Sequence, residues 1–477
     1  MSRESNLELG MRHPMRRTIE DDLLRWKNGR VRKALLILGE RQIGKSFVVR
    51  RFGQTEYDYF LEINFIDDPD AKFLFQPARS AQMVLQAISV RHPEFKMENG
   101  RSLLFLDEIQ KCPEAVTALK FLVDDGRVDV IASGSMLGIG ANAPESYPAG
   151  SVTELSMHPM SFEEYLLARG MDPSIPDMIR DHIRRREPFG EPLLNALQEN
   201  FRNYMLVGGM PECVLLHTLD STDMDSVIRT QRDLIDSYRR DIQAYAPKDE
   251  ILKVSREFDL IPAQLGRPNK RIMFNEIEDR DNVGFREYGG AIGWMIESRM
   301  VNACINLNGI ENPLSEHMTP SQVKLYTNDT GLLMNMMGRE TMLAILNDDI
   351  SVNEGAIAEN IVCQMLRCND LPTFYFDLSK QDAPRMEVDF ITMLGSSIAA
   401  IEVKSGKKRR APSIANLKKD VRGKEVGRFI KLYNGDITTP AHDPEFEHYP
   451  MFCIAFADAM IPKEEGLELP EAPIIRI

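Results

Sequence analysis

The 477-residue sequence lacks a run of apolar residues that could cross a membrane. No segment approaches the roughly twenty consecutive apolar residues that a membrane helix needs. The basic residues within residues 1–17 are not followed by an apolar run either, so the sequence predicts no secretory signal. Both absences indicate a cytoplasmic protein without a membrane partner.

Cysteine is scarce and scattered. The six cysteines form no CxxC pair and no cluster with histidine: Cys112, Cys213, Cys304, Cys363, Cys368 and Cys453. This spacing excludes a disulfide framework and a zinc site with the usual arrangement of ligands. We expect the cysteines to act as small hydrophobic residues in a reducing compartment.

Positive charge is in deficit over the whole chain, which carries 58 Lys and Arg against 72 Asp and Glu and a formal net charge of −14. Such a balance argues against indiscriminate binding of nucleic acid by the whole surface. Residues 401–440 are the exception, with eleven basic against four acidic residues and a local charge of +7. A local nucleic-acid site therefore stays open in that segment.

The remaining composition is ordinary for a soluble globular protein, with 43% hydrophobic and 27% charged residues. A chain of this length is expected to form about three domains rather than a single core.

Residues 35–53, LLILGERQIGKSFVVRRFG, are the most informative stretch. A strand-like segment precedes the pattern GxxxxGK[ST], and a helical pattern that we expect to end at Gly53 follows it. Such a loop offers backbone N–H groups and a positive helix end to a triphosphate. We expect ATP here, with Lys45 on the β and γ phosphates and the Ser46 hydroxyl on Mg²⁺. The expected nucleotide-binding residues of the loop are Gly39, Glu40, Arg41, Gln42, Ile43, Gly44, Lys45 and Ser46.

Residues 101–114, RSLLFLDEIQKCPE, predict a buried parallel strand with Asp107 and Glu108 at its carboxyl end. In an open α/β sheet, ligands bind at that edge. We expect Asp107 to hold the Mg²⁺ shell and Glu108 to orient and polarise the attacking water. Taken alone, the pair fits a strand end with two solvated acids equally well; its place after a phosphate-binding loop favours the catalytic interpretation.

Residues 128–135, VDVIASGS, predict another buried strand that ends in small polar residues. Ser133 or Ser135 could bond the γ-phosphate or the attacking water, or the run could simply begin a turn. Two further strands are predicted over residues 59–65 and 151–157. Strands alternating with helices predict an α/β fold, in which a P-loop parallel sheet has helices on both faces.

Five motifs follow one another along the chain: ILGERQIGKS, LLFLDEIQ, VIASGSMLG, SVTELSMHPMSFEEYL and YMLVGGMPE. With them the chain resembles a large prokaryotic group of AAA-type P-loop ATPases of unknown function, whose C-terminal domain is similar to the PD-(D/E)xK nucleases. The resemblance implies an ATPase domain over residues 1–205, a helical and winged-helix-like region over 206–345 and a nuclease-like α/β domain over 346–477. Members usually have proline where Glu40 stands, a minor departure because that position contributes its backbone.

The middle region is predicted to be helical. Arg239 and Arg240 lie in a long charged helix; they are candidates for an arginine finger or sensor arginine, but we favour a solvated basic face. Residues 251–308 predict three helical pieces, of which residues 284–305 form the last and longest. Because this helix has few basic residues, a packing or dimerisation module fits better than a DNA-reading helix.

A second group of charged residues lies near the C-terminus. Residues 354–368 predict a helix, and strands are predicted to begin at residues 374, 387 and 398. Period-two alternation places Asp389 on one face of its strand, and Glu402 with Lys404 on one face of the next. If these strands are neighbours, the two carboxylates could hold a divalent metal and the lysine could help to deprotonate or orient the attacking water.

This group matches the D…ExK arrangement of restriction-type nucleases, with Glu359 in the place of their helical acid. The resemblance therefore implies Glu359 and Lys404 as catalytic residues and Asp389 and Glu402 as metal ligands. The alternative is a hairpin with its charges outward, in which ExK is only an ion pair within one strand. The basic run after Lys404 could lie along the phosphate backbone of a nucleic acid.

The sequence thus predicts a Mg²⁺-dependent ATPase whose nucleotide state controls a nuclease-like domain that acts on nucleic acid. Two alternatives stay open: a nucleotide-gated switch or scaffold whose C-terminal domain does not cut, and a regulator that reads DNA through residues 251–308. A homo-oligomer is a candidate assembly.

Overall fold

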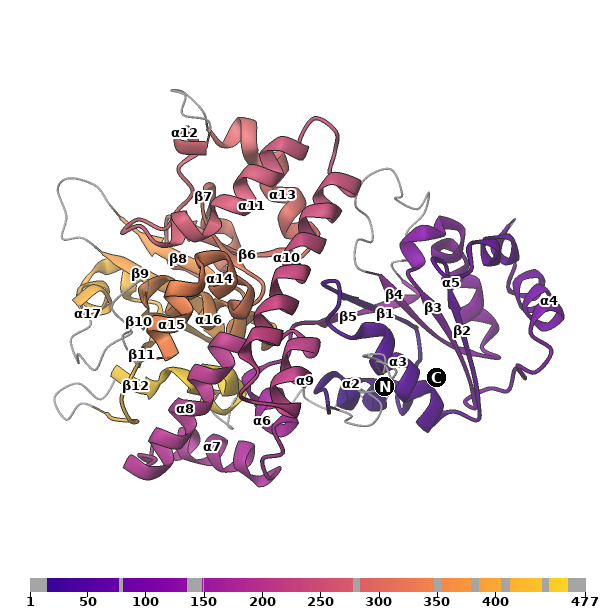
Figure 1. The fold of residues 1–477 in the computed structure, drawn as a ribbon, viewed down its shortest axis with the longest axis horizontal. Coiled ribbons are helices and arrows are strands. Elements are labelled where there is room, and N and C mark those ends of the chain that lie inside the picture. Colours follow the sequence, from indigo (N-terminus) through magenta and orange to yellow (C-terminus); the bar gives the residue numbers. More distant parts are fainter. Residues whose placement is uncertain are drawn as a thin grey trace, which may run out of the picture. The chain divides into compact units, whose positions relative to one another are not determined.

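The computed structural model of the chain describes residues 15–76, 80–134, 148, 150–277, 284–346, 354–378, 386–404, 412–439 and 446–461 (Figure 1). The chain divides into two compact units. The first contains Met1–Met171, Asn203–Asn302 and Leu325–Asp349; the second contains Asp172–Arg202, Ala303–Lys324 and Ile350–Ile477. These units do not coincide with the domain boundaries expected at residues 205 and 345, so the division into three family domains stays a proposal.

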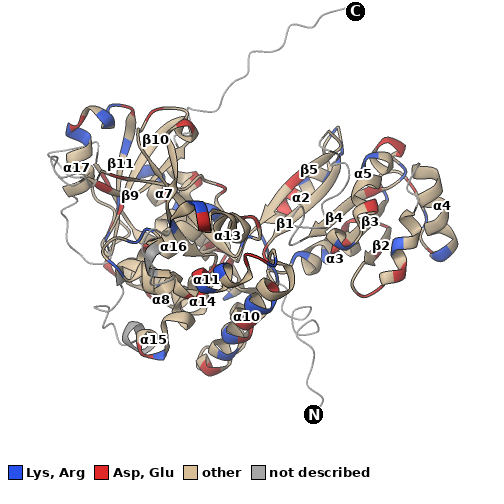
Figure 2. Cartoon of the chain, turned by 90° about the horizontal axis from the view of Figure 1, so that it is seen from above, with Lys and Arg blue, Asp and Glu red and all other residues tan. Residues whose placement is uncertain are grey.

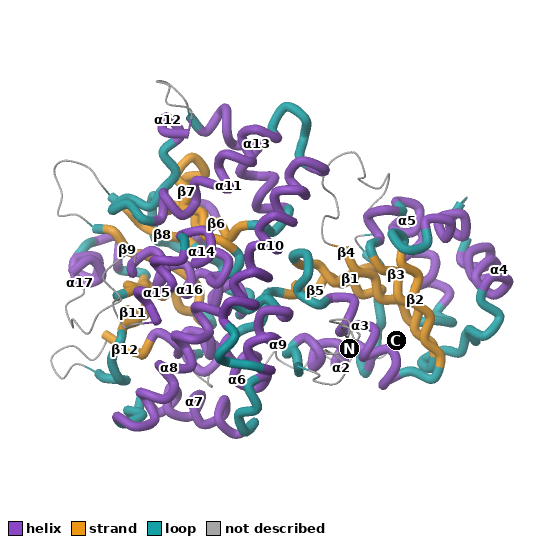
Figure 3. The backbone as a smooth tube through the Cα atoms, viewed as in Figure 1, coloured by secondary structure: helices purple, strands orange, loops and turns teal. Residues whose placement is uncertain are grey.

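A five-stranded parallel sheet organises the N-terminal part of the first unit, with the order β2-β3-β4-β1-β5. Its strands are β1 (Ala34–Gly39), β2 (Tyr59–Asn64), β3 (Ser102–Asp107), β4 (Asp129–Gly134) and β5 (Val152–Met157). Every residue of β3 and β4 is buried, as a parallel sheet covered on both faces requires. The predicted parallel α/β sheet is confirmed. Figure 3 shows its strands with helices around them.

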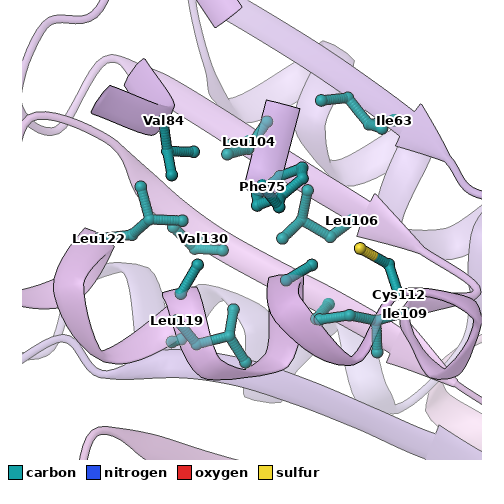
Figure 4. Close-up of a cluster of buried hydrophobic side chains, with 14 of the residues drawn as sticks. Ile63, Phe75, Val84, Leu104, Leu106, Ile109, Cys112, Leu119, Leu122 and Val130 are labelled. Carbon is teal, nitrogen blue, oxygen red and sulfur yellow. The ribbon is translucent and has the colours of Figure 1, made fainter. Parts of the chain in front are cut away.

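Helices cover this sheet: α2 (Ile19–Lys27), α3 (Lys45–Glu56), α4 (Ala81–Arg91) and α5 (Pro113–Asp125). Leu104 and Val130 of the sheet pack against Leu119 and Leu122 of α5 and Val84 of α4 in one buried cluster (Figure 4). Because successive strand residues point to opposite faces, the other face of the sheet is left for α3.

Gly53 does not end α3, which continues to Glu56. The prediction of a C-cap was wrong, because the need for glycine comes from packing. A Cβ atom at Gly53 would lie 2.2 Å from the ring of Phe60 on β2, so only glycine lets helix and strand approach this closely.

The rest of the first unit is mainly helical. Its elements are α6 (Phe162–Ala168), the end of α8 (Glu191–Val207), α9 (Pro211–Leu219), α10 (Met224–Tyr245), α11 (Ile251–Leu265), α12 (Phe274–Ile277), α13 (Phe285–Glu297), α14 (Thr330–Met337) and α15 (Arg339–Leu346). Figure 2 shows Lys and Arg beside Asp and Glu along α10, which is amphipathic and buries residues such as Leu234 and Tyr238. Residues 211–297 of the predicted middle region are mainly helical as expected, whereas residues 301–307 and 318–327 of that region are strands.

The expected long helix over residues 284–305 is wrong in its second half. Helix α13 ends at Glu297, and β6 (Val301–Leu307) follows. Arg299 has a left-handed backbone with φ of 61°, which a continuing helix cannot contain. With 13 residues, α13 is also shorter than the 15-residue α11.

A seven-stranded mixed sheet has the order β12-β11-β10-β9-β8-β6-β7 and lies mostly in the second unit. Besides β6, its strands are β7 (Met318–Thr327), β8 (Phe374–Asp377), β9 (Glu387–Leu394), β10 (Ser397–Val403), β11 (Val426–Tyr433) and β12 (Phe446–Pro450). The three predicted strands, β8 to β10, are neighbours and antiparallel. The helices of this unit are α7 (Ser174–Arg185), most of α8, α16 (Glu354–Cys368) and α17 (Pro412–Lys419).

The apolar segment that begins at Met451 forms the 3-10 helical η6 (Met451–Met460) rather than a strand. A short apolar run alone cannot distinguish a buried strand from a buried helix. Arg180 of α7 pairs with Asp458 of η6 at 3.0 Å, and Phe189 contacts Phe452 at 5.4 Å between ring centres. These contacts explain why residues 172–202 belong to the second unit.

Among the described residues, no helix combines the length and the apolar character that a membrane span requires.

Candidate functional site

The phosphate-binding loop connects β1 to α3, and two of its residues have left-handed backbones. They are Gln42, with φ of 63°, and Gly44, with φ of 89°, which is also the N-cap of α3. At Gly39 only glycine fits, because a Cβ atom there would lie 2.3 Å from the carbonyl oxygen of Met157. Successive N–H groups in such a turn form a concave anion site at the positive end of α3.

Arg17 is buried and supports this loop through hydrogen bonds and an ion pair. Its guanidinium donates to the carbonyl oxygen of Ile43 at 2.8 Å and to that of His158 at 2.7 Å, and it pairs with Glu164 at 3.0 Å. Sequence analysis missed this residue, because nothing in its local sequence distinguishes it from the other basic residues near the N-terminus.

Lys45 is buried at the start of α3. Its ammonium donates to the carbonyl oxygen of Gly39 at 2.9 Å and to that of Glu40. Burial lowers the pKa of Lys45 to about 8, although Glu108, Glu40 and Asp107 act in the opposite direction. A buried ammonium whose charge is poorly compensated is well placed to attract a phosphate.

Asp107 is buried at the end of β3 and accepts hydrogen bonds from three side chains. Ser46 Oγ donates at 2.7 Å and Asn64 Nδ2 at 3.0 Å, both to Oδ2, while Ser133 Oγ donates to Oδ1. The structure therefore brings together the loop hydroxyl and the acid that the sequence predicted as a magnesium pair. Their oxygen atoms are of the kind that Mg²⁺ prefers, so the residues present fit this ion.

Ser133 contacts Asp107 and is itself buried. Its predicted contact with a γ-phosphate stays a prediction, and Ser135 lies outside the described residues.

Glu108 follows Asp107 in a left-handed conformation with φ of 56°. Its backbone N–H donates to Asp107 Oδ1 at 3.1 Å, and Gln110 Nε2 donates to its carboxylate at 2.5 Å. A non-glycine residue seldom adopts this backbone, and such residues concentrate at functional sites. The turn fixes Glu108 beside the loop, where the charges of Glu108 and Lys45 interact.

Residues in the last turns of α10 contact the phosphate-binding loop. Arg41 donates to the carboxylate of Asp241, and its guanidinium lies 5.1 Å from the centre of the Tyr245 ring. Burial raises the pKa of Asp241 against the effect of Arg41, which lowers it. Arg239 differs: it is exposed and pairs with Asp236 and Asp259, as expected for a solvated basic face.

Arg299 is a second residue that sequence analysis did not place at the site. Its guanidinium donates to Ser156 Oγ at 3.2 Å, one residue before the end of β5. Ser156 is the register partner of Leu38 on β1, directly before the loop. The Arg299 charge also contributes to lowering the pKa of Lys45. Its left-handed backbone is the only unusual local feature, and it is invisible in the sequence.

The two glycines of the motif YMLVGGMPE are explained by close approaches. A Cβ atom at Gly208, where φ is 77°, would lie 2.1 Å from the carboxylate of Asp329, and one at Gly209 would lie 2.2 Å from the carbonyl oxygen of Met160. Gly209 N–H donates to Asp329 at 2.5 Å. The two glycines therefore allow the end of α8 to pack closely against the start of α14 and the segment after β5.

In the second unit, Asp389, Glu402 and Lys404 are tied into local contacts. Val403 N–H donates to Asp389 Oδ2 at 2.8 Å. Glu402 pairs with Lys404 at 2.8 Å and accepts the N–H of Ile414 on α17 at 3.3 Å. Burial opposes the charge of Lys404, but the contact with Glu402 outweighs it and raises the pKa of Lys404.

A third cation, Lys324 of β7, reaches the acids of this group. Its Nζ lies 3.7 Å from Glu359 of α16 and 3.8 Å from Glu387 of β9, and only 1% of the residue is exposed. Burial opposes the charge of Lys324, but Glu359 and Asp389 outweigh that effect and raise its pKa above the usual range. Sequence analysis missed Lys324 because no motif joins β7 to the later strands. Within the described ranges, no three His, Cys, Asp or Glu residues are arranged to hold a metal ion.

The basic run after Lys404 is not wholly on the surface. Lys431 is fully buried against the ring of Tyr433, and Arg428 is buried in an ion pair with Glu447. Residues 405–411 lie outside the described residues.

Residues 31–166 match the family model of an AAA domain. Residues 198–343 match a domain of unknown function, DUF8612, and residues 354–452 match another, DUF4143. No curated protein matches the chain.

Three solved structures are similar at low identity. The Orc1 protein of Aeropyrum pernix in complex with DNA is 13% identical with a TM-score of 0.25, covering 72% of this chain and 94% of that one. A RuvB variant from Thermotoga maritima is 12% identical with a TM-score of 0.23, covering 62% and 89%. A STAND protein with a tetratricopeptide repeat sensor from Pyrococcus horikoshii is 11% identical with a TM-score of 0.25, covering 74% and 46%.

These TM-scores are too low to carry an argument about function, so the assignment rests on the family model and on the loop geometry. Residues 31–166 have both the sequence and the phosphate-binding geometry of an AAA domain of the P-loop ATPase class.

Proposed function

We propose that the chain binds ATP with Mg²⁺ and hydrolyses it at the loop between β1 and α3. The observation that carries the proposal is the hydrogen bond from Ser46 to Asp107, with Lys45 buried beside them. It joins the loop hydroxyl to the strand-end acid at the carboxyl edge of the parallel sheet, where ligands of open α/β folds bind.

The residues have distinct roles in this proposal. Loop N–H groups from Gly39 to Ser46 bind the phosphates, and the ammonium of Lys45 turns from the carbonyl oxygens of the loop to the β and γ phosphate oxygens. Glu108, held by Gln110, orients the attacking water and accepts its proton. Arg299 adds positive charge on the β5 side, which would stabilise the charge on the transferred phosphoryl group.

Ser46 and Asp107 are the residues that would hold Mg²⁺. When bound, the ion supplies charge neutralisation between the phosphate oxygens. The side chains of Asn64 and Ser133 donate hydrogen bonds to the Asp107 carboxylate and so orient it. Hydrogen-bond partners of metal ligands have this role at metal sites.

ATP turnover by purified protein tests this proposal. We expect Lys45→Ala to lose nucleotide binding, and Glu108→Gln to bind ATP while hydrolysis falls by about 10²- to 10⁴-fold. Unchanged turnover in both variants would refute the proposed site. Repeating the assay with DNA or RNA identifies the polymer, if any, that stimulates turnover.

For the remainder of the chain, we propose a helical and winged-helix-like region over residues 206–345 and a nuclease-like domain over residues 346–477. Two functions are candidates for the latter: cleavage of nucleic acid through Asp389, Glu402, Lys404 and Glu359, or ATP-gated binding without cleavage. The position of Lys324 among the acids favours the second. A cytoplasmic location and self-association complete the proposal.

A digestion assay with Mg²⁺ or Mn²⁺ separates the two candidates. If the domain cleaves, wild-type protein degrades DNA or RNA while Asp389→Ala and Lys404→Ala do not. Identical products from all three proteins would support a domain that binds without cutting.

A further inference from the structure

The Lys324 side chain extends from β7 into the interior of the second unit, where 1% of the residue is exposed. Nζ has no hydrogen-bond partner among the described residues. An ammonium that is removed from water without compensation is strongly unfavourable, so its surroundings must supply negative charge.

Carboxylates supply that charge. Glu359 Oε2 lies 3.7 Å away and Glu387 Oε1 lies 3.8 Å away, so the ammonium sits between two acids and is bonded tightly to neither. The ring of Tyr375 lies 4.7 Å from Nζ on a further side. Asp389 lies two residues after Glu387 in β9, so both side chains are on the same face of the strand.

The acids in turn need a cation. Glu359 is 5% exposed, and several carboxylates this close repel one another unless a positive charge lies among them. A divalent metal is one solution and requires oxygen ligands at about 2.0–2.6 Å. An ammonium among the same carboxylates is the other solution, and the two cannot occupy the same space.

The two predicted metal ligands, Asp389 and Glu402, have partners of their own. Asp389 Oδ2 accepts the N–H of Val403, and the carboxylate of Glu402 is shared between Lys404 and the N–H of Ile414. The acids expected to bind a metal therefore do not fit one while Lys324 is in place.

We propose that Lys324 is a built-in cation that takes the place of a divalent metal in the carboxylate cluster of Glu359, Glu387 and Asp389. The C-terminal unit then keeps its nuclease-like acids as a metal-independent structural centre. This inference rests on the proposed non-cleaving function of that unit and is independent of ATP hydrolysis by the first.

Equilibrium dialysis of the full-length chain against Mn²⁺ tests the inference. Replacing the ammonium by an apolar chain of similar length, in Lys324→Met, removes this buried positive charge from among the acids, and we expect a gain of about one bound Mn²⁺ per chain over wild type. Adding Asp389→Asn to that variant should remove the gain. Arg428→Met is the matched control, because Arg428 is also a buried cation of the second unit but pairs with Glu447 and not with these acids, so it should leave Mn²⁺ binding unchanged.

A folded Lys324→Met protein without the extra Mn²⁺ would overturn the inference. A second measurement does not depend on that variant folding: wild type and Asp389→Asn should bind the same amount of Mn²⁺. A loss of one ion in Asp389→Asn would show that a metal binds beside Lys324 and would also overturn it. Neither result bears on ATP turnover by Lys45 and Glu108 variants, so the two proposals fail separately.

Discussion

The guanidinium of Arg41 donates a hydrogen bond to the carboxylate of Asp241, which lies 200 residues further along the chain. One partner belongs to the phosphate-binding loop and the other to the last turns of α10. Together with the contact between Arg41 and the Tyr245 ring, this ion pair makes α10 a direct support of the loop.

Loss of this ion pair should weaken the first unit. We expect Asp241→Ala to lower the free energy of unfolding by about 1–3 kcal/mol, since it leaves a partly buried guanidinium without its charged acceptor. ATP affinity should fall in parallel because the loop loses its support. Urea unfolding and nucleotide titration measure the two effects.

Asp236→Asn is the matched control on the same helix. Asp236 pairs with the exposed Arg239, so its replacement should change stability by less than about 0.5 kcal/mol. Equal effects of the two substitutions would contradict a supporting role for Asp241.

The buried ammonium of Lys45 predicts a pH dependence of the nucleotide-free protein. Burial lowers the pKa of Lys45 from 10.5 to about 8, so the unfolded chain binds more protons than the folded one between these values. Stability from this group therefore rises with pH through that window, and the cost of burying the charge, about 3 kcal/mol, is present in full below it.

Lys45→Met should remove this contribution. We expect the variant to gain stability over wild type at pH 7, and the gain to shrink as the pH approaches 10. Chemical unfolding of both proteins across this range measures the difference. A constant difference would mean that Lys45 is solvated in solution.

Two substitutions of Arg299 distinguish the role of its side chain in ATP turnover from the effect of its backbone conformation on stability. We expect Arg299→Ala and Arg299→Gly to lower ATP turnover equally, by about 10²-fold, because both lose the guanidinium. Glycine should be the more stable of the two by about 1 kcal/mol, since the backbone at this position is left-handed.

Arg286→Ala provides the comparison, because Arg286 is an exposed arginine at the start of α13. Turnover that is unaffected by both Arg299 substitutions would remove this residue from the proposed mechanism.

Gly53 and Gly293 make opposite predictions for the same substitution. In Gly53→Ala the new methyl group meets the ring of Phe60, and we expect a loss of about 1–3 kcal/mol. In Gly293→Ala, within α13, the new methyl group meets no atom within 4 Å apart from the adjoining backbone of its own helix, and we expect a gain of about 0.5–1 kcal/mol. Thermal unfolding of the two variants checks the signs.

The sequence was sufficient where the signal is local. The phosphate-binding loop, the strand that ends in Asp107 and the alternation of β9 and β10 are each read within one segment, and all five strands of the parallel sheet follow from such patterns. Their relation in space follows from the rule that parallel strands bring their carboxyl ends to one edge.

The errors and omissions have a common physical origin. The contacts of Arg17, Asp241 and Lys324 join segments far apart in the chain, and no local pattern encodes them. The missed strand β6 follows a left-handed residue, Arg299, whose backbone is set by the surrounding packing rather than by its own side chain.

Asp107 receives hydrogen bonds from Ser46, Asn64 and Ser133. An ion at this carboxylate would share its oxygen atoms with these donors. Asn64 is connected further, since its Oδ1 accepts the N–H groups of Ile66 and Asp67 in the turn after β2. Asn64 therefore connects the acid to an exposed turn, where Ile66 presents 48% of its surface to solvent.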